Sequence, residues 1–111
     1  MTPLAIAMKS REALLDKKAQ DVVVLDVSRL SGVTDYFVIA TGTNAPHLKA
    51  MLEEVSRKLK KEGVPSYRRS ADAESPWLVL DYVDVVIHIF SPEAREYYAI
   101  EALWADAPRI D

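Results

Sequence analysis

Cysteine is missing from the 111-residue sequence, and this absence narrows the chemistry open to the chain. Disulfide bonds, thiolate metal sites and cysteine nucleophiles are all excluded. No apolar run approaches the roughly 20 residues that a helix needs to span a bilayer. Residues 1–18 also lack the basic start and the long apolar centre of a signal peptide. We therefore expect a cytoplasmic protein without membrane contact.

The sequence also lacks an excess of positive charge. It contains 14 Lys and Arg residues and 17 Asp and Glu residues, which gives a net charge of -3. This balance disfavours binding to free nucleic acid, whose phosphate backbone requires a basic surface. It suits a basic protein surface better. With three glycines, 50% apolar and 28% charged residues, the composition is that of an ordinary globular protein. Neither a linker nor a repeat divides the chain, so we predict one domain over residues 1–111.

Helical and strand patterns alternate along the chain. Thr2 and Pro3 are typical of a helix start, and Leu4, Ala7, Met8, Leu14 and Leu15 then recur at helical spacing. Asn44 and Pro46 predict the start of a second helix with an apolar face of Leu48, Met51, Leu52, Val55 and Leu59. The expected helices span 2–19, 46–62 and 92–107, and the expected strands 21–27, 34–42, 64–70, 77–82 and 84–90.

This order, α-β-β-α-β-β-β-α, predicts the fold class. Strands that are consecutive in sequence usually pair as hairpins, and the helix between the second and third strands permits a crossover. We therefore expect a mixed sheet of about five strands flanked by helices, in the α/β class or at its border with α+β.

Two close aspartates first suggest catalysis. Asp81 and Asp84 flank the probable turn between the last two strands, where they could hold a metal ion or simply cap the turn. A nucleotidyl-transfer enzyme could use them with Asp26 and magnesium. Such a site would also require a Gly-Ser pair, which the sequence lacks. Turn capping is therefore the favoured interpretation, and we expect no enzyme and no cofactor.

The histidines and the one glycine-bearing loop favour structural roles. His88 shares a strand face with Val86 and Phe90, and no recognisable nucleophile motif accompanies it. His47 has no metal-ligand spacing with His88. TGTNAPH, residues 41–47, joins a strand to a helix as an anion site does, but one glycine in seven residues does not make a phosphate loop.

Aromatic residues are concentrated in the C-terminal third: Trp77, Tyr82, Phe90, Tyr97, Tyr98 and Trp104. Two sequential tyrosines on a helix diverge by about 100°, so both cannot point inward equally. Aromatic residues together with Arg95 and flanking acids are typical of the centre of a protein interface. An exposed docking surface is therefore predicted here.

Three segments resemble the ribosomal silencing factor family, also called Iojap-related or RsfS proteins: DYFVIATGTNAPHLKAM, WLVLDYVDVVIHIFSPEAREYYAIEALW and DAPRI. The resemblance implies a fold related to nucleotidyltransferases but without their catalytic apparatus. It implies binding to the large ribosomal subunit through its fourteenth protein, which would block joining of the small subunit and so repress translation. It also implies a homodimer off the ribosome. An adaptor for large-subunit assembly is the remaining alternative.

The candidate interface combines this resemblance with the aromatic clustering. It comprises Trp77, Asp81, Tyr82, His88, Phe90, Glu93, Arg95, Glu96, Tyr97 and Tyr98. Two departures from the family pattern bear on it. Val83 stands where the family commonly has glycine, and a β-branched residue resists the positive φ of a tight turn, so this turn is expected to relax or change type. ADAESP, residues 71–76, lacks the glycine of the corresponding acidic stretch.

Overall fold

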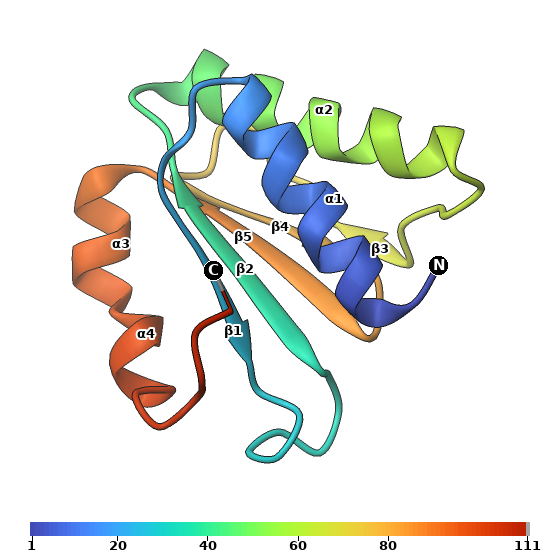
Figure 1. The fold of residues 1–111 in the computed structure, drawn as a ribbon. Coiled ribbons are helices and arrows are strands. Elements are labelled where there is room, and N and C mark those ends of the chain that lie inside the picture. The colour runs from blue at the N-terminus through green and yellow to red at the C-terminus, as the bar shows by residue number, and fades with distance from the viewer. Residues whose placement is uncertain (111) are drawn as a thin grey trace.

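A mixed five-stranded sheet lies at the centre of the structure, a computed structural model that describes residues 1–110 (Figure 1). Its elements are α1 (Pro3–Asp16), β1 (Gln20–Asp26), β2 (Tyr36–Thr41), α2 (Ala45–Lys61), β3 (Arg68–Arg69), β4 (Trp77–Asp81), β5 (Val85–Phe90), α3 (Pro92–Tyr98) and α4 (Ile100–Leu103). The predicted mixed sheet flanked by helices is confirmed, and the fold is α+β. None of the helices in residues 1–110 is long and apolar enough to cross a membrane.

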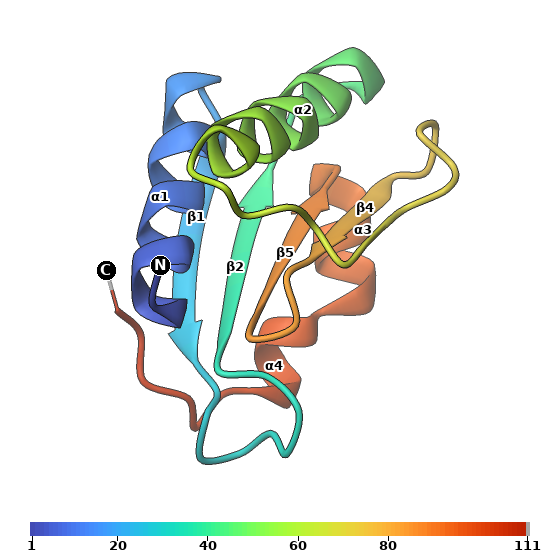
Figure 2. The same ribbon diagram turned by 90° about the vertical axis from the view of Figure 1, so that its right-hand side faces the viewer.

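The strand order is β1-β2-β5-β4-β3, which places β5 between β2 and β4. Hairpins join β1 to β2 and β4 to β5 in antiparallel pairs, and β3 also pairs antiparallel with β4. β2 and β5 pair in parallel, because α2 and the two strands after it carry the chain back before β5 begins. Figures 1 and 2 show α1 and α2 on one face of the sheet and α3 and α4 on the other side.

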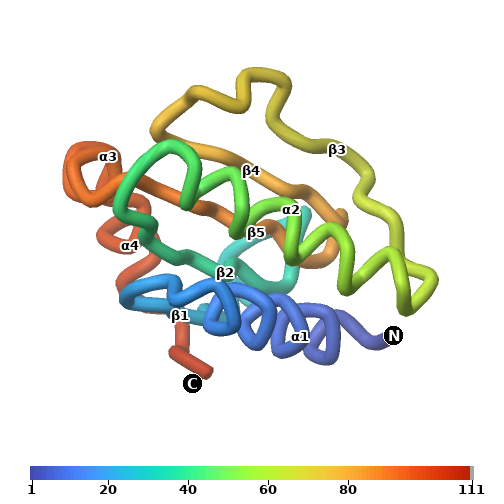
Figure 3. The backbone as a smooth tube through the Cα atoms, turned by 90° about the horizontal axis from the view of Figure 1, so that it is seen from above, coloured from blue at the N-terminus to red at the C-terminus, as the bar shows by residue number. Residues whose placement is uncertain are grey.

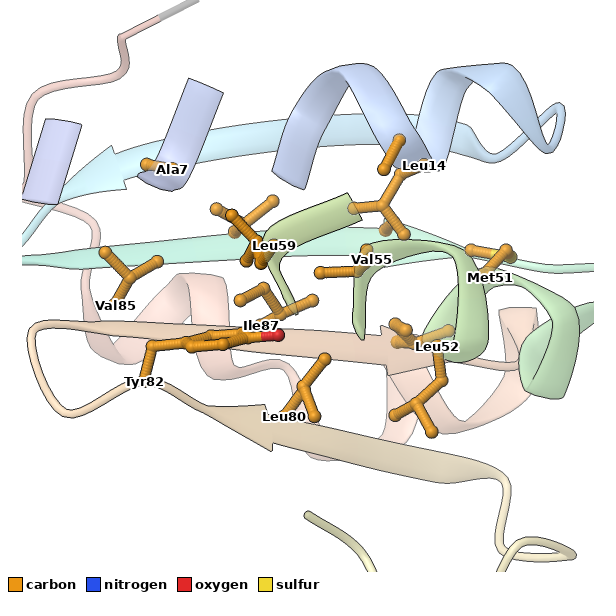
Figure 4. Packing of buried hydrophobic residues seen from close by; sticks show 14 of the residues in the cluster. Ala7, Leu14, Met51, Leu52, Val55, Leu59, Leu80, Tyr82, Val85 and Ile87 are labelled. Carbon is orange, nitrogen blue, oxygen red and sulfur yellow. The ribbon is translucent and has the colours of Figure 1, made fainter. Parts of the chain in front are cut away.

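α2 follows its sequence signals closely. The Asn44 side chain accepts a hydrogen bond from the His47 amide at 2.9 Å, and Gly63, with a φ of 81°, lies just beyond the helix end. The whole predicted apolar face is buried against the sheet: Leu48, Met51, Leu52, Val55 and Leu59. Figure 4 shows several of these side chains packed over β4 and β5. The prediction for this helix is confirmed.

α1 corrects part of the prediction. Thr2 caps it as expected, but it ends at Asp16 instead of near residue 19. Its buried residues are Ile6, Ala7, Ser10, Ala13 and Leu14. Leu4, Met8 and Leu15, which the pattern placed on the inner face, are exposed. Apolar residues occur on more than one side of this helix, so spacing alone does not identify the side that meets the sheet.

Gly42 and His47 fix the start of α2 against the sheet and α1. A Cβ on Gly42 would lie 2.9 Å from the Met51 sulfur, so a side chain at this position would force the buried Met51 to shift. His47 Nδ1 accepts from the Thr43 amide at 2.9 Å, and Nε2 donates to the Lys17 carbonyl at 2.6 Å. The amides of Thr43 and His47 therefore already have protein partners at the loop that resembled an anion site.

The expected final helix is two helices. Ala99 adopts a left-handed conformation, with φ 46° and ψ 45°. This conformation ends α3 and changes the direction of the chain before α4 begins. Arg95 joins the two parts, since its guanidinium pairs with both carboxylate oxygens of Glu101 at 2.8 and 3.1 Å. The same guanidinium donates to the Asp21 carbonyl and the Thr41 hydroxyl at 2.7 and 2.8 Å. Helical spacing continued through Ala99, so the sequence pattern did not reveal the break.

The C-terminal tail, residues 108–110, runs back along β1 (Figures 1 and 3). Arg109 forms an antiparallel bridge with Leu25, and the Ile110 amide donates to the Val24 carbonyl at 2.8 Å. The outer edge of β1 is therefore paired with backbone over this stretch. On the opposite edge, the loop between β3 and β4 extends away from the body of the molecule (Figure 3).

The turn between β4 and β5 is strained at Val83. The Asp84 amide donates to the Tyr82 carbonyl at 2.9 Å, and Val83 between them has a φ of 72°. This is a γ-turn in its rare, strained form. Asp81 Oδ1 accepts from the Val83 amide at 2.7 Å and so stabilises the turn, as expected for turn capping. The turn has not relaxed away from positive φ, even though the residue is β-branched.

We predict that Val83→Gly stabilises the protein by about 1 kcal/mol. Positive φ costs an L-residue about 1–2 kcal/mol, and removal of that strain outweighs the added freedom of glycine in the unfolded chain. Urea unfolding measures the difference. Val33→Gly is the matched control, because Val33 is exposed and is not among the residues with positive φ, so this change should destabilise slightly. Equal effects of the two substitutions would contradict a strained turn.

Candidate protein-binding surface

The sheet face opposite α1 and α2 is only partly covered. Over β1 and β2, a buried cluster packs against side chains of the last two helices and the segment after them; it contains Val23, Leu25, Val27, Ile39, Phe90 and Ala94. β4 and β5 contribute a less protected area. Trp77, Val79, Asp81 and Val86 are each half-buried there, since alternate residues of these strands point to this face. We call this area the open face.

Aromatic rings form a continuous chain over the open face, which we call the aromatic cluster: Phe37, Trp77, His88, Phe90, Tyr97, Tyr98 and Trp104. At one end Trp104 meets Phe37 edge-on, with ring centroids 5.2 Å apart, and Phe37 meets His88 at 4.9 Å. At the other end Trp77 and Tyr98 have centroids 4.6 Å apart. Contacts of this kind add about 0.5–1.5 kcal/mol each beyond burial, so the cluster is a preorganised surface.

His88 lies at the centre of this cluster and is only 8% exposed. The Trp77 indole Nε1–H donates to its Nδ1 at 3.1 Å. Since Nδ1 accepts this bond, the neutral ring carries its proton on Nε2. Burial lowers the pKa of His88 to about 4, and the nearby Asp81 carboxylate opposes this shift only in part. The imidazole is therefore neutral at pH 7, and its Nε2 has no hydrogen-bond partner.

A groove of about 610 Å³ lies beside His88. Its lining residues come from the loop after β1, from β2, β4 and β5, from the segment before β3, from the β4–β5 turn and from the end of α4: Leu30, Ser31, Gly32, Val33, Thr34, Phe37, Tyr67, Asp81, Val83, Val86, His88 and Trp104. Several apolar side chains at its rim are exposed, including Val33 at 84% and Val83 at 51%. Apolar side chains left open around a concave surface are typical of a binding site.

Sequence reasoning found only part of this groove. Asp81 and His88 were among the candidate interface residues, but Leu30, Val33 and Tyr67 were not. These residues come from separate loops that only the fold brings together. One signal was present: Leu30 and Val33 are large apolar residues on either side of the Ser31-Gly32 turn, where polar residues are the usual choice.

Several predicted interface residues do reach the surface. Tyr97 is 81% exposed and Tyr98 46%, so Tyr97 is the tyrosine that points outward. Tyr98 instead packs on Trp77 and also contacts the Tyr97 ring, at a centroid distance of 5.0 Å. Glu93 and Glu96 are exposed on the same helix. The surface that α3 presents is thus aromatic with an acidic border.

Besides His88, three further predicted interface residues are interior. Phe90 is fully buried, because α3 covers the end of β5. Tyr82 lies in the core on the α2 side, where burial raises its pKa to about 12 (Figure 4). The Arg95 side chain is only 14% exposed and is engaged with Glu101 and two other groups. Alternation and composition did not distinguish these positions from exposed ones.

The three aspartates considered for nucleotidyl transfer do not converge. Asp26 ends β1 and Asp81 ends β4, and two strands separate them, which amounts to about 14 Å at normal strand spacing. Asp26 instead accepts from the Ser28 hydroxyl at 2.6 Å, and this bond lowers its pKa. Within residues 1–110 no group of three or more His, Asp or Glu side chains could hold a metal ion.

Comparison with known proteins gives consistent matches over nearly the whole chain. A family model described as "Ribosomal silencing factor during starvation" matches residues 2–111. The ribosomal silencing factor of Bacillus subtilis (strain 168) is 35% identical over 96 residues, which cover 86% of this chain and 81% of that protein. A crystal structure of a Chromobacterium violaceum protein, 38% identical, superposes with a TM-score of 0.90 over 95% of this chain and 88% of that one.

A mouse relative has a name that describes a different role on the ribosome. "Mitochondrial assembly of ribosomal large subunit protein 1" of Mus musculus is 37% identical over 94 residues, which cover 82% of this chain and 41% of that protein. The names of these relatives describe silencing or assembly factors rather than enzymes.

The pKa of His88 predicts a pH-dependent loss of stability. Between about pH 6.5 and pH 4, His88 is protonated in the unfolded chain but stays neutral in the folded protein. The free energy of unfolding therefore decreases as the pH falls through this range. The loss reaches about 2 kcal/mol by pH 5. His88→Asn keeps an acceptor for the Trp77 indole but does not titrate. Urea unfolding at pH 7 and pH 5 should therefore show a larger loss for the original protein, and identical losses would refute the assignment.

Proposed function

The chain belongs to the ribosomal silencing factor family, and from this premise we propose that it binds the large ribosomal subunit and keeps the small subunit from joining. The observation that carries the proposal is the open face, where exposed aromatic and apolar side chains surround a groove. A rigid aromatic surface of this kind favours a protein partner, because large side chains that are already ordered lose little entropy on binding.

The proposed contact on the subunit is its fourteenth protein. Ribosomal proteins are generally basic, and Glu93 and Glu96 lie on the helix that carries Tyr97. Neither glutamate forms one of the ion pairs found within residues 1–110. The tyrosines would supply affinity and the carboxylates would orient the partner.

Silencing by this route requires no chemistry. A protein that occupies the surface used for subunit joining excludes the small subunit sterically, provided that it binds tightly enough to compete. A typical stable interface buries about 800 Å² on each partner. The rim of the groove and the outer sides of α3 and α4 offer exposed apolar residues for such a contact, including Val33, Tyr97 and Leu103.

A second candidate function is assistance in large-subunit assembly, which the name of the mouse relative favours. It would use the same surface without competing for subunit joining. In the absence of ribosomes, a second copy of the chain could cover the exposed apolar residues, and we include this homodimer in the proposal. Sedimentation of the free protein at increasing concentration tests it.

Subunit joining gives the decisive measurement. Purified small and large subunits are mixed with and without saturating protein and separated on a sucrose gradient. We expect the peak of joined ribosomes to fall and the separate subunits to rise. Undiminished joining, together with cosedimentation of the protein with large subunits, would favour the assembly role. Failure to cosediment would refute both.

Tyr97→Ala tests the aromatic surface. Because Tyr97 is largely exposed, its removal should leave the unfolding free energy nearly unchanged while weakening binding to large subunits about tenfold. Lys49→Ala, an exposed change on α2, is the control and should not alter binding. A pull-down with large subunits measures both. Unaltered affinity in the tyrosine variant would exclude this side chain from the contact.

A further inference from the structure

Two buried polar groups without partners line the groove. His88 Nε2 and the Thr34 hydroxyl oxygen form no hydrogen bond and are shielded from solvent, and both residues contribute to the groove wall. A buried donor or acceptor left unpaired costs about 1–3 kcal/mol, so such groups are uncommon unless a partner completes them. Two of the three such side-chain groups within residues 1–110 lie in this one groove, the third being the Tyr82 hydroxyl in the core, and polar groups of a ligand would satisfy both.

The kind of group follows from the tautomer of His88. Trp77 donates to Nδ1, so Nε2 carries the proton and is a hydrogen-bond donor. His88 lines the groove, whereas Trp77, which occupies Nδ1, does not. The complementary group is an acceptor. A backbone carbonyl fits this requirement inside an otherwise apolar groove.

Strain at the rim points to the same place. Val83 keeps a positive φ, a conformation that glycine would adopt without penalty, and places an exposed apolar side chain on the groove wall. Residues held in such conformations are often part of binding sites. The Val83 side chain adds apolar surface to the groove wall. Contact between this surface and a bound ligand would offset the backbone strain at Val83.

Charge at the mouth of the groove favours a basic occupant. Asp81 lines the groove, and the Asp35 amide bonds to the Asp84 carbonyl at 2.9 Å, which brings two more aspartates to this end of the sheet. Arg68 pairs in register with Asp81 and is the cation nearest to them in the strand pairing. The Asp81 carboxylate on the groove wall, with Asp35 and Asp84 at the same end of the sheet, would attract a positively charged segment.

We propose that the groove binds an extended segment of the protein partner, which inserts an apolar side chain flanked by a basic residue and offers a backbone carbonyl to His88 Nε2–H. This inference rests on the proposed function and specifies how the large-subunit protein is recognised. A side chain of the groove wall shifts to admit the carbonyl, as commonly happens when interfaces form. The Thr34 hydroxyl can then receive an amide of the same segment.

The test compares groove variants for binding to purified large subunits and to their isolated fourteenth protein. His88→Asn keeps the acceptor for Trp77 but loses the donor, and should lower affinity about tenfold. His88→Gln carries its amide about as far as Nε2 and should recover most of that loss. Val83→Gly should weaken binding severalfold although it stabilises the fold, a combination that a purely structural role would not produce.

The outcomes separate this inference from the proposed function. If the original protein binds and all three variants bind equally well, the groove is not used and the inference is overturned, while the function stands. If the original protein does not bind large subunits, the function fails and the inference fails with it. Val33→Asp is examined for self-association as well. Loss of a dimer without loss of subunit binding would make a second copy the occupant and would also overturn the inference.

Discussion

The double burial of β5 is the constraint on which the rest of the structure depends. Val85, Ile87 and Ile89 point into the core under α1 and α2, while His88 and Phe90 point to the opposite face. One strand thus connects the core that holds the sheet together with the face that carries the aromatic cluster. A partner bound over His88 would rest on the central strand of the sheet, which is buried along nearly its whole length.

Much of this fold could be predicted from the sequence because local and tertiary preferences agree. The helix from Ala45 to Lys61 has a cap, one apolar face and a glycine stop, and the sheet buries that face completely. Four of the strands likewise follow from apolar runs between turn residues, but the expected strand over residues 64–70 is wrong for most of its length, since only Arg68–Arg69 forms β3. Prediction also failed where local preference was weak: nothing in the sequence around Ala99 marks a helix break, which in the fold accompanies the contacts of Arg95 with Glu101, Asp21 and Thr41.

The candidate surface was predictable in part. Exposed tyrosines on a helix can be inferred from composition, but burial of Phe90 and Arg95 depends on how α3 lies over the sheet. The groove could not be inferred at all, since Val33 and Tyr67 belong to loops separated by more than one element. The proposed function was inferred from the family resemblance, because residue patterns alone left it open. The apolar and hydrogen-bonding groups of the surface were identified only from the side-chain geometry.

Pairing of the C-terminal tail with β1 has a consequence for how partners can be recognised. Strand addition requires a free row of backbone donors and acceptors at a sheet edge. Over Val24 and Leu25 that row is occupied, and the opposite edge is the two-residue strand Arg68–Arg69. The sheet is therefore poorly suited to extension by another chain. A partner would therefore be recognised through side chains on the face of the sheet. Which partner binds would depend on the shape of that face and on the positions of its hydrogen-bond donors.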